Sequence, residues 1–301
     1  METIEFGHGV PPMSRIVYGA WRLSDDHDTT PDHVLEKIEL CLAQGITTFD
    51  HADIYGDYEC EALFGRALRN RPDLRDTMQI VTKCGIMAMS DKFPRRRVKH
   101  YDTSAAHIRN SVEVALGQLG FDVIDLLLIH RPDPFLDHHE TGAALDALVD
   151  EGKVRGIGVS NFMPWDIDLL QSAMTHPILT NQIEINLVNK AAFTNGQIAR
   201  AQRDGAPPMA WSPLAGGSMF YPGDQVGKRV MPRLTEIAAD QGVSAEAVAV
   251  AWLLAHPARI VPVVGTNSLK RIERIADALK VTLDRQTWFE LWSLAEGDEV
   301  P

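Results

Sequence analysis

The chain has 301 residues, of which 45% are hydrophobic and 23% charged, a composition typical of a folded globular protein. Its formal net charge is −12, so its overall field repels nucleic-acid phosphates and anionic membrane surfaces. The three cysteines match no zinc or disulfide spacing, which favours a reducing compartment. No secretion signal is visible, and the longest apolar run, 247–255, is too short to cross a bilayer. We therefore expect a cytoplasmic protein with no nucleic-acid or membrane partner.

Short apolar runs alternate with helical patterns along the chain. Several runs, such as Leu126-Leu127-Leu128-Ile129, are apolar throughout, which is typical of strands buried on both faces of a parallel sheet. The expected strands cover 14–18, 47–50, 79–83, 123–130, 156–160, 181–186, 208–212 and 261–265.

The segments between these strands carry apolar residues at helical spacing, and several end at a glycine. The expected helices cover 32–44, 57–69, 104–119, 140–151, 165–173, 196–203, 233–241, 245–255, 269–278 and 285–294. A strand–helix unit of roughly 38 residues, repeated eight times without a linker, predicts an α/β protein folded as a single (β/α)8 TIM barrel over 1–301. Residues 4–7 and 10–13 precede the first strand, and we expect them to form a β-hairpin that closes the barrel floor.

Polar side chains follow three neighbouring strands of this barrel. Asp50 and Tyr55 follow the second strand, Lys83 ends the third and His130 ends the fourth. Each has a structural alternative, since the Asp could cap a turn and the Tyr and His could pack in a core. A lysine ending a buried strand needs a polar partner, however. Because TIM barrels place their active sites at these strand ends, the four residues together predict one site.

Six motifs carry a resemblance to a known family. They are F-D-x-A-x-x-Y-G at 49–56, T-K at 82–83, L-L-I-H at 127–130, G-x-G-V-S-N at 156–161, N-Q-I-E at 181–184 and W-S-P-L at 211–214. In combination, over nearly the whole chain, they resemble the aldo-keto reductases. The segment 130–134 is similar to bacterial YdhF-type reductases.

The resemblance implies reversible, NADPH-dependent reduction of aldehyde or ketone carbonyls, with Asp50, Tyr55, Lys83 and His130 as catalytic residues. Tyr55 would be the general acid. A phenol is a weak acid near neutral pH, and a neighbouring lysine cation favours the phenolate and so lowers its pKa. Asp50 would hold the Lys83 cation, and His130 would orient the substrate carbonyl.

The cofactor site is also implied by the resemblance, because no G-x-G-x-x-G motif follows the first strand. Ser160, Asn161 and Gln182 would hold the nicotinamide carboxamide, and Trp211 would stack on its ring; taken alone, Trp211 could be a core residue. Arg271 matches the arginine that binds the 2′-phosphate of NADPH, in a loop leading into a helix, and this favours NADPH over NADH. Gly265 stands where many family members have a lysine. The remaining cofactor residues implied are Gly19, Trp21, Asp50, Ser212, Leu214, Gly216, Thr266, Asn267 and Arg274.

Two other functions stay open at this point. A metal-dependent hydrolase could use His51, Asp53 and His130, although this leaves Tyr55 and Lys83 without a role, and the sequence assigns no metal. A sensor that binds NADPH without turnover is the second. The basic run 94–100 is either a solvated loop or a feature that attracts an acidic substrate. The partner expected is a small carbonyl compound, and a monomer is plausible.

Overall fold

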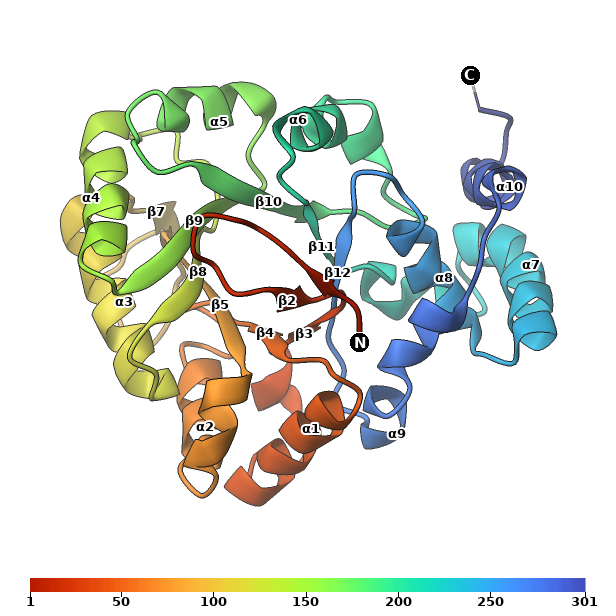
Figure 1. Ribbon diagram of the computed structural model, residues 1–301, viewed down its shortest axis with the longest axis horizontal. Coiled ribbons are helices and arrows are strands. Elements are labelled where there is room, and N and C mark those ends of the chain that lie inside the picture. The colour runs from red at the N-terminus through yellow and green to blue at the C-terminus, as the bar shows by residue number, and fades with distance from the viewer. Residues whose placement is uncertain (301) are drawn as a thin grey trace.

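Eight parallel strands close into a barrel in the computed structural model of the chain, which describes residues 1–300 (Figure 1). The strands follow one another around the barrel in sequence order, and β12 pairs with β3 to complete the ring. They are β3 (Val17–Gly19), β4 (Thr48–Asp50), β5 (Gln79–Cys84), β8 (Ile124–Ile129), β9 (Val154–Ser160), β10 (Ile178–Glu184), β11 (Met209–Trp211) and β12 (Val261–Val264). The predicted α/β class and (β/α)8 barrel are confirmed.

The barrel strands are buried on both faces. β8 is buried along its whole length, as its unbroken apolar run predicts. Leu126 and Leu128 lie in one cluster with Val261 from across the barrel, whereas Leu127 and Ile129 pack in the cluster that includes the outer helices. This alternation anchors each strand from both sides, so the polar residues that follow the strands have fixed positions.

Helices surround the barrel on all sides in Figure 1. Several begin at a side-chain cap: Ser104, Asp137 and Ser244 each accept a hydrogen bond from a backbone N–H in the first turn. The helices are α1 (Pro31–Ala43), α2 (Cys60–Leu68), α3 (Ala105–Leu119), α4 (His138–Asp150), α5 (Pro164–Gln171), α6 (Gln197–Asp204), α7 (Gln225–Gln241), α8 (Ala245–Leu254), α9 (Leu269–Ile272) and α10 (Arg285–Glu296). Short 3-10 helices cover Leu23–Asp25, Pro72–Thr77, Ala191–Phe193, Ala215–Phe220 and Ile275–Lys280.

The N-terminal segment forms the expected hairpin, in which β1 (Thr3–Ile4) pairs antiparallel with β2 (Met13–Ser14). In Figure 1 it crosses the barrel opening that faces the viewer. Ile4, Phe6 and Met13 pack in the same cluster as the interior strand residues, so the hairpin closes this end of the barrel.

Several predicted elements are shifted by two or three residues at their ends, and three differ from the structure by more than that or are divided. The strand expected at 14–18 is divided between β2 and β3, because Ser14 leaves the barrel and bonds to Thr48 through backbone and side chain. The helix expected at 233–241 begins at Gln225, where Asp224 caps it, and it runs through Pro232. The helix expected at 269–278 is divided into α9 and a 3-10 helix.

A second hairpin was not predicted. β6 (Ile86–Met87) pairs antiparallel with β7 (His100–Tyr101), and the basic run forms part of the segment that connects them. Strands of two residues carry too little periodicity to be recognised in a sequence.

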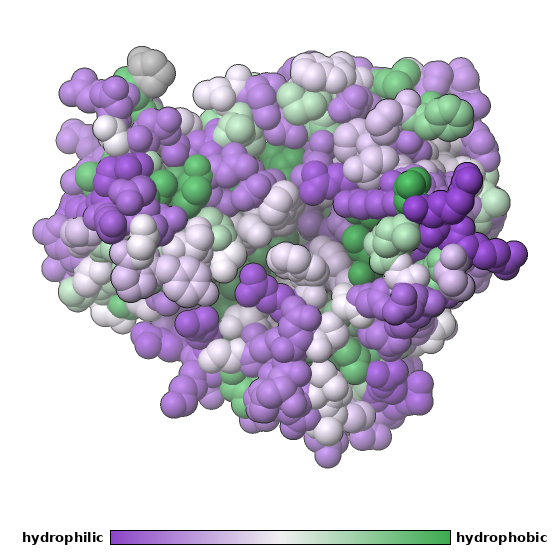
Figure 2. All heavy atoms as spheres, turned by 180° about the vertical axis from the view of Figure 1, so that it is seen from behind, coloured by the Kyte–Doolittle hydropathy of each residue, from purple (hydrophilic) through white to green (hydrophobic). Residues whose placement is uncertain are grey.

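Among residues 1–300, no single helix is long and apolar enough to span a membrane. Helices α7 and α8, bent by 93° at the break between them, meet that criterion only as a pair, by length and composition. The barrel end opposite the N-terminal hairpin is the face seen in Figure 2, and it is hollowed near its centre. The carboxyl ends of the barrel strands meet at this face.

Candidate active site

One cavity of about 1250 Å³ lies at the carboxyl ends of the barrel strands. Asp50, Tyr55 and His130 line it, and so does every residue that the sequence predicts for the cofactor. These are Gly19, Trp21, Asp50, Ser160, Asn161, Gln182, Trp211, Ser212, Leu214, Gly216, Gly265, Thr266, Asn267, Arg271 and Arg274. Lys83 lies behind this lining and is almost completely buried. The structure therefore brings all predicted site residues together.

Lys83 is the centre of the polar cluster. Its ammonium group donates to Asp50 Oδ2 at 2.7 Å, to Tyr55 Oη at 2.9 Å and to the carbonyl oxygen of His51 at 2.8 Å. An ammonium group has three donors, so these contacts satisfy it completely. The pairing of β4 with β5 sets this geometry, because it places the strand ends that carry Asp50 and Lys83 next to each other.

The charge state of this cluster follows from burial and from its own contacts. Burial lowers the pKa of Lys83, but Asp50 and Tyr55 more than offset this, so the pKa lies above its ordinary value and the cation persists. Burial raises the pKa of Tyr55, and the Lys83 cation opposes that increase only in part. Lys83 lowers the pKa of Tyr55, as expected. Burial has the larger effect, however, so the pKa of Tyr55 lies above its ordinary value. Tyr55 is protonated at neutral pH, as a proton donor must be.

His130 lies next to Tyr55 in the lining of the cavity. The two rings meet edge to face, with centroids 5.9 Å apart and planes inclined by 79°. Burial, followed by the Lys83 cation, holds the His130 pKa well below its usual range. The imidazole is therefore neutral at pH 7, a state that can donate one hydrogen bond to a substrate oxygen.

A chain of amide and hydroxyl groups continues from Asp50 around the cavity. Gln182 Nε2 donates to Asp50 Oδ1 at 2.7 Å, and Ser160 Oγ donates to the Gln182 carbonyl at 2.8 Å. Asn161 Nδ2 donates to Ser160 Oγ at 2.8 Å, and Trp211 Nε1 donates to Asn161 Oδ1 at 3.0 Å. Asn161 adopts a left-handed φ of 62°, which is uncommon outside glycine and frequent at functional sites. Trp211 thus borders the cavity with its ring edge fixed.

Two features of the structure support the fit of a dinucleotide. The cavity exceeds the usual volume of small-ligand sites, about 300–1,000 Å³. Amide donors and acceptors suited to a carboxamide lie at one end, and cations suited to phosphate lie at the other. The residues present therefore fit a nicotinamide dinucleotide.

The cations at the phosphate end are not equivalent. Arg274 pairs with Asp277 through Nε and Oδ2 at 3.3 Å, whereas Arg271 forms no ion pair with any residue in 1–300. The segment leads into a helix, as expected, although α9 has only four residues. The side chains of Arg271 and Lys270 line the cavity without an ion pair in 1–300 and are suited to an anion, and the contribution of the helix N-terminus stays a prediction.

Sequence reasoning missed several lining residues on the side of His130. Lys99 and Tyr101 reach the cavity from the β6–β7 hairpin, and Arg131 follows His130 directly. The Arg131 guanidinium lies 6.0 Å from the centre of the Trp211 ring. Lys99 is the only residue of the basic run 94–100 that lines the cavity, and all of that run except Arg96 is exposed, as in a solvated loop. Arg131 could have been found from its position after His130, at the end of a barrel strand.

The three residues considered for a metal-dependent hydrolase, His51, Asp53 and His130, do not line one common cavity. His51 is fully buried against Phe64, with ring centroids 4.6 Å apart, and neither His51 nor Asp53 lines the cavity that contains His130. In the part of the chain that the structure describes, no three His, Cys, Asp or Glu side chains are grouped closely enough to hold a metal ion.

Comparison with known proteins agrees with this geometry. The profile of the Aldo/keto reductase family matches residues 15–296. The 6-dehydroglucose reductase of Agrobacterium fabrum is 60% identical over 96% of this chain and 96% of its own, and the oxidoreductase YdhF of Escherichia coli is 40% identical over 97% and 96%. The structure of the glycerol dehydrogenase AKR11B4 from Gluconobacter oxydans superposes with a TM-score of 0.86 at 24% identity, over 99% of this chain and 97% of that one. The chain belongs to the aldo/keto reductase family and is an oxidoreductase.

Proposed function

We propose that this protein reduces aldehyde and ketone carbonyls with NADPH, and that Tyr55 supplies the proton. The contact of Lys83 with both Asp50 and Tyr55 is the observation that carries this proposal, because it places a phenol, a fixed cation and a neutral imidazole around one point of a cavity suited to a dinucleotide. Bound NADPH would supply a hydride to the carbonyl carbon.

The residues of the chain would do the remaining work. His130 donates a hydrogen bond to the carbonyl oxygen and orients it. As negative charge develops on that oxygen, Tyr55 donates its proton, and Lys83 stabilises the phenolate that results. Asp50 keeps Lys83 charged and in place. In the direction of alcohol oxidation, the same phenolate acts as the base. Trp211 would hold the nicotinamide ring while Asn161, Ser160 and Gln182 hold its carboxamide.

We further propose that the substrate is a hydrophilic, sugar-like aldehyde. The support is the name of the relative from Agrobacterium, since 6-dehydroglucose carries its aldehyde on a polyhydroxylated chain. The cavity lining agrees with it: Lys99 and Arg131 lie near His130, and both act on its pKa. Ammonium and guanidinium groups are hydrogen-bond donors only, so they match the oxygen acceptors of a sugar rather than an alkyl chain.

The catalytic assignment is tested by Tyr55→Phe, which removes the proton donor and retains the ring. NADPH oxidation should be followed with a panel of aldehydes, ketones and quinones. We expect kcat to fall by at least about a hundredfold, the lower end for general acid catalysis, with the Kd of NADPH nearly unchanged. Lys83→Met should be comparably harmful. A Tyr55→Phe variant with most of its activity would disprove the role of Tyr55 as proton donor. A wild type that binds NADPH and reduces nothing would disprove the reductase function and favour the sensor.

The substrate class is tested by Arg131→Met, which keeps the apolar stem of the side chain. We expect kcat/KM to fall about tenfold for glyceraldehyde or a hexose aldehyde, the loss of one charge-assisted hydrogen bond, and to change little for butanal. Similar losses for both substrates would show that Arg131 does not contact the substrate hydroxyls. Comparison of low and high salt separates a neutral sugar from an anionic aldehyde, because only the latter should lose affinity as salt rises.

We also propose that the protein works in the cytoplasm as a monomer, with a small molecule as its partner. Its three cysteines are free and buried, as in proteins of reducing compartments, and its charge of −12 disfavours nucleic acid.

A further inference from the structure

A buried lysine outside the catalytic cluster lies beneath the cofactor end of the cavity. Lys37 belongs to α1 and projects from the same stripe as Val34, Ile38 and Cys41, all of them buried. Its side chain is 1% exposed. Burial of an unpaired cation costs free energy of folding, so the partners of Lys37 indicate which parts of the fold it holds together.

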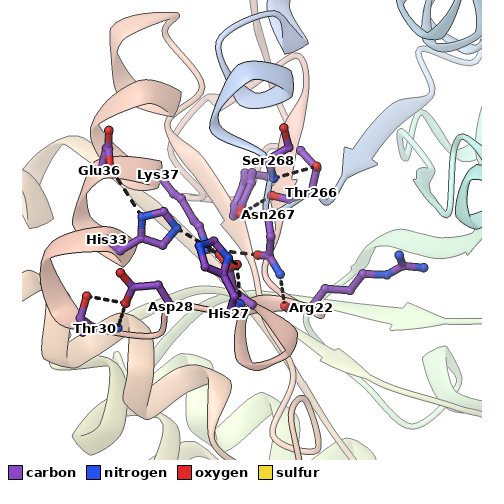
Figure 3. Close-up of polar contacts among 12 residues, drawn as sticks. Arg22, His27, Asp28, Thr30, His33, Glu36, Lys37, Thr266, Asn267 and Ser268 are labelled. Carbon is purple, nitrogen blue, oxygen red and sulfur yellow. Dashed lines mark hydrogen bonds and ion pairs between the residues drawn. The ribbon is translucent and has the colours of Figure 1, made fainter.

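The first partner is Asp26, in the loop that follows β3. Lys37 Nζ contacts Asp26 Oδ2, and the carboxylate is itself only 4% exposed. Two imidazoles approach the same carboxylate, His27 Nδ1 at 2.6 Å and His33 Nε2 at 3.1 Å (Figure 3). The side chain of His27 is 85% exposed, so Lys37 is the fully buried charge in this group.

The second partner lies in the loop that follows β12. Lys37 Nζ donates to Asn267 Oδ1 at 3.2 Å, and Asn267 Nδ2 donates to the carbonyl oxygen of Arg22 at 2.6 Å. Figure 3 shows Lys37 reaching from α1 toward Asn267, with Arg22 on the far side. One buried ammonium group therefore joins α1 and the loop before it to the loop after β12, where Asn267 lies 230 residues further along the sequence than Lys37.

The two loops joined in this way form neighbouring parts of the cavity wall, because β3 and β12 are adjacent strands of the barrel. Arg22 and Asn267 both line the cavity, and Asn267 lies just before the segment that carries Arg271. Lys37 does not line the cavity. Lys37 contacts Asn267, which lines the cavity, but it would not itself contact the cofactor.

We propose that Lys37 and Asp26 are a positioning pair that fixes the Asn267 loop, and through it Arg271, in the arrangement that binds the phosphate end of NADPH. This rests on the proposed NADPH site. Loss of Lys37 frees the Asn267 loop and leaves the Asp26 carboxylate without its cation beside a site for anions. NADPH, which carries the additional phosphate, therefore loses more affinity than NADH.

The test uses Lys37→Met, Asp26→Asn and the double variant, with Kd measured for NADPH and NADH from the change in tryptophan fluorescence. We expect Lys37→Met to weaken NADPH binding about tenfold or more, and NADH binding less. The double variant, which leaves no unpaired charge, should recover part of the loss. At saturating NADPH, kcat should stay near the wild-type value. Without cofactor, hydrogen exchange of the 265–274 amides should become faster in Lys37→Met.

Lys190→Met is the matched control, because it also removes a lysine that is mostly buried and ion-paired, with Nζ 3.0 Å from Glu296 Oε2 and the side chain 8% exposed. Lys190 does not line the cavity. Thermal unfolding shows that each variant is folded before Kd is measured. If Lys37→Met binds NADPH as tightly as the wild type, or loses no more than Lys190→Met, the positioning role is wrong. A wild type that fails to bind NADPH refutes the proposed function instead.

Discussion

Arg271 would carry the discrimination between NADPH and NADH in the proposed site. It is exposed, lines the cavity and forms no ion pair with a residue in 1–300, in contrast to Arg274. A guanidinium presents a planar set of donors that fits phosphate oxygens. The chain has a net charge of −12, so attraction of a dianionic group depends on local cations such as Arg271 and its neighbour Lys270.

Arg271→Ala should therefore weaken NADPH binding by about ten- to a hundredfold, the equivalent of about 1.5–3 kcal/mol, and leave NADH binding nearly unchanged. The loss should shrink at high salt, because the contact is partly exposed. Kd for both cofactors at two salt concentrations measures this. Lys280→Ala is the control, since that lysine pairs with Asp277 outside the cavity. Equal losses of affinity for NADPH and NADH would show that Arg271 does not bind the 2′-phosphate.

Residues of the site that directly follow a strand could be identified from the sequence, because strand ends in a barrel converge. Lys37 shows what was missed and why. Positions 34, 37, 38 and 41 share one face of a helix, so a lysine at 37 lies on an otherwise apolar stripe. That pattern predicts a buried, paired cation. It does not identify Asp26 or Asn267 as partners, which depend on how three elements pack.

At the scale of elements, the barrel strands could be predicted because each is a buried run with a strong pattern. The β6–β7 hairpin could not, since each strand has two residues and its pairing is set by tertiary contacts. This hairpin has a functional consequence, because it brings Lys99 and Tyr101 to the cavity. The part of the cavity formed by this hairpin is therefore the hardest to predict from the sequence, whereas Asp50, Lys83 and His130 could be predicted from motifs at the ends of regular strands.

The helix predicted at 269–278 shows a second limit. Its apolar spacing continues through Ile272 and Ile275, both buried, so the pattern suggested one helix. The backbone leaves the helix at Glu273 and Arg274, and a 3-10 helix follows. Element boundaries of this kind are decided by local packing and not by periodicity. The break lies at the C-terminal end of α9, so it leaves the N-terminal backbone N–H groups of that helix in place.

At the scale of the whole molecule, stability depends on ionisable groups that the barrel buries behind the cavity. Glu61 is 2% exposed and accepts a hydrogen bond from Thr82 Oγ1 at 2.5 Å. Burial raises its pKa from 4.5 to about 7, despite that hydrogen bond and the nearby Lys83. His51 shows the converse, since burial and the Lys83 cation lower its pKa to about 3, so it stays neutral when folded. For both side chains, burial in the folded protein disfavours the charged form.

The sign of each contribution follows from linkage between protonation and folding. Glu61 holds its proton more tightly in the folded state, so its contribution to stability is complete below pH 4.5 and is lost as pH rises through about 7. His51 binds a proton more readily in the unfolded chain, so its contribution is present above about pH 6.5 and is lost as pH falls toward 3. The contributions of Glu61 and His51 to stability change with pH in opposite directions. A substitution at one of the two positions therefore measures the contribution of that residue alone.

Glu61→Gln should therefore stabilise the protein in a pH-dependent manner. Glutamine retains an acceptor for Thr82 and has no charge to bury. One pKa unit corresponds to about 1.4 kcal/mol, so the step from 4.5 to about 7 is worth on the order of 3 kcal/mol above neutral pH. Thermal unfolding midpoints of wild type and variant should nearly coincide at pH 4.5 and separate by pH 8, with the variant higher. Glu236→Gln, at an exposed position, should show no such separation. A Glu61→Gln variant that is less stable than wild type at pH 8 would mean that the ionised carboxylate is stabilising, and that Lys83 depends on Glu61 as well as on Asp50.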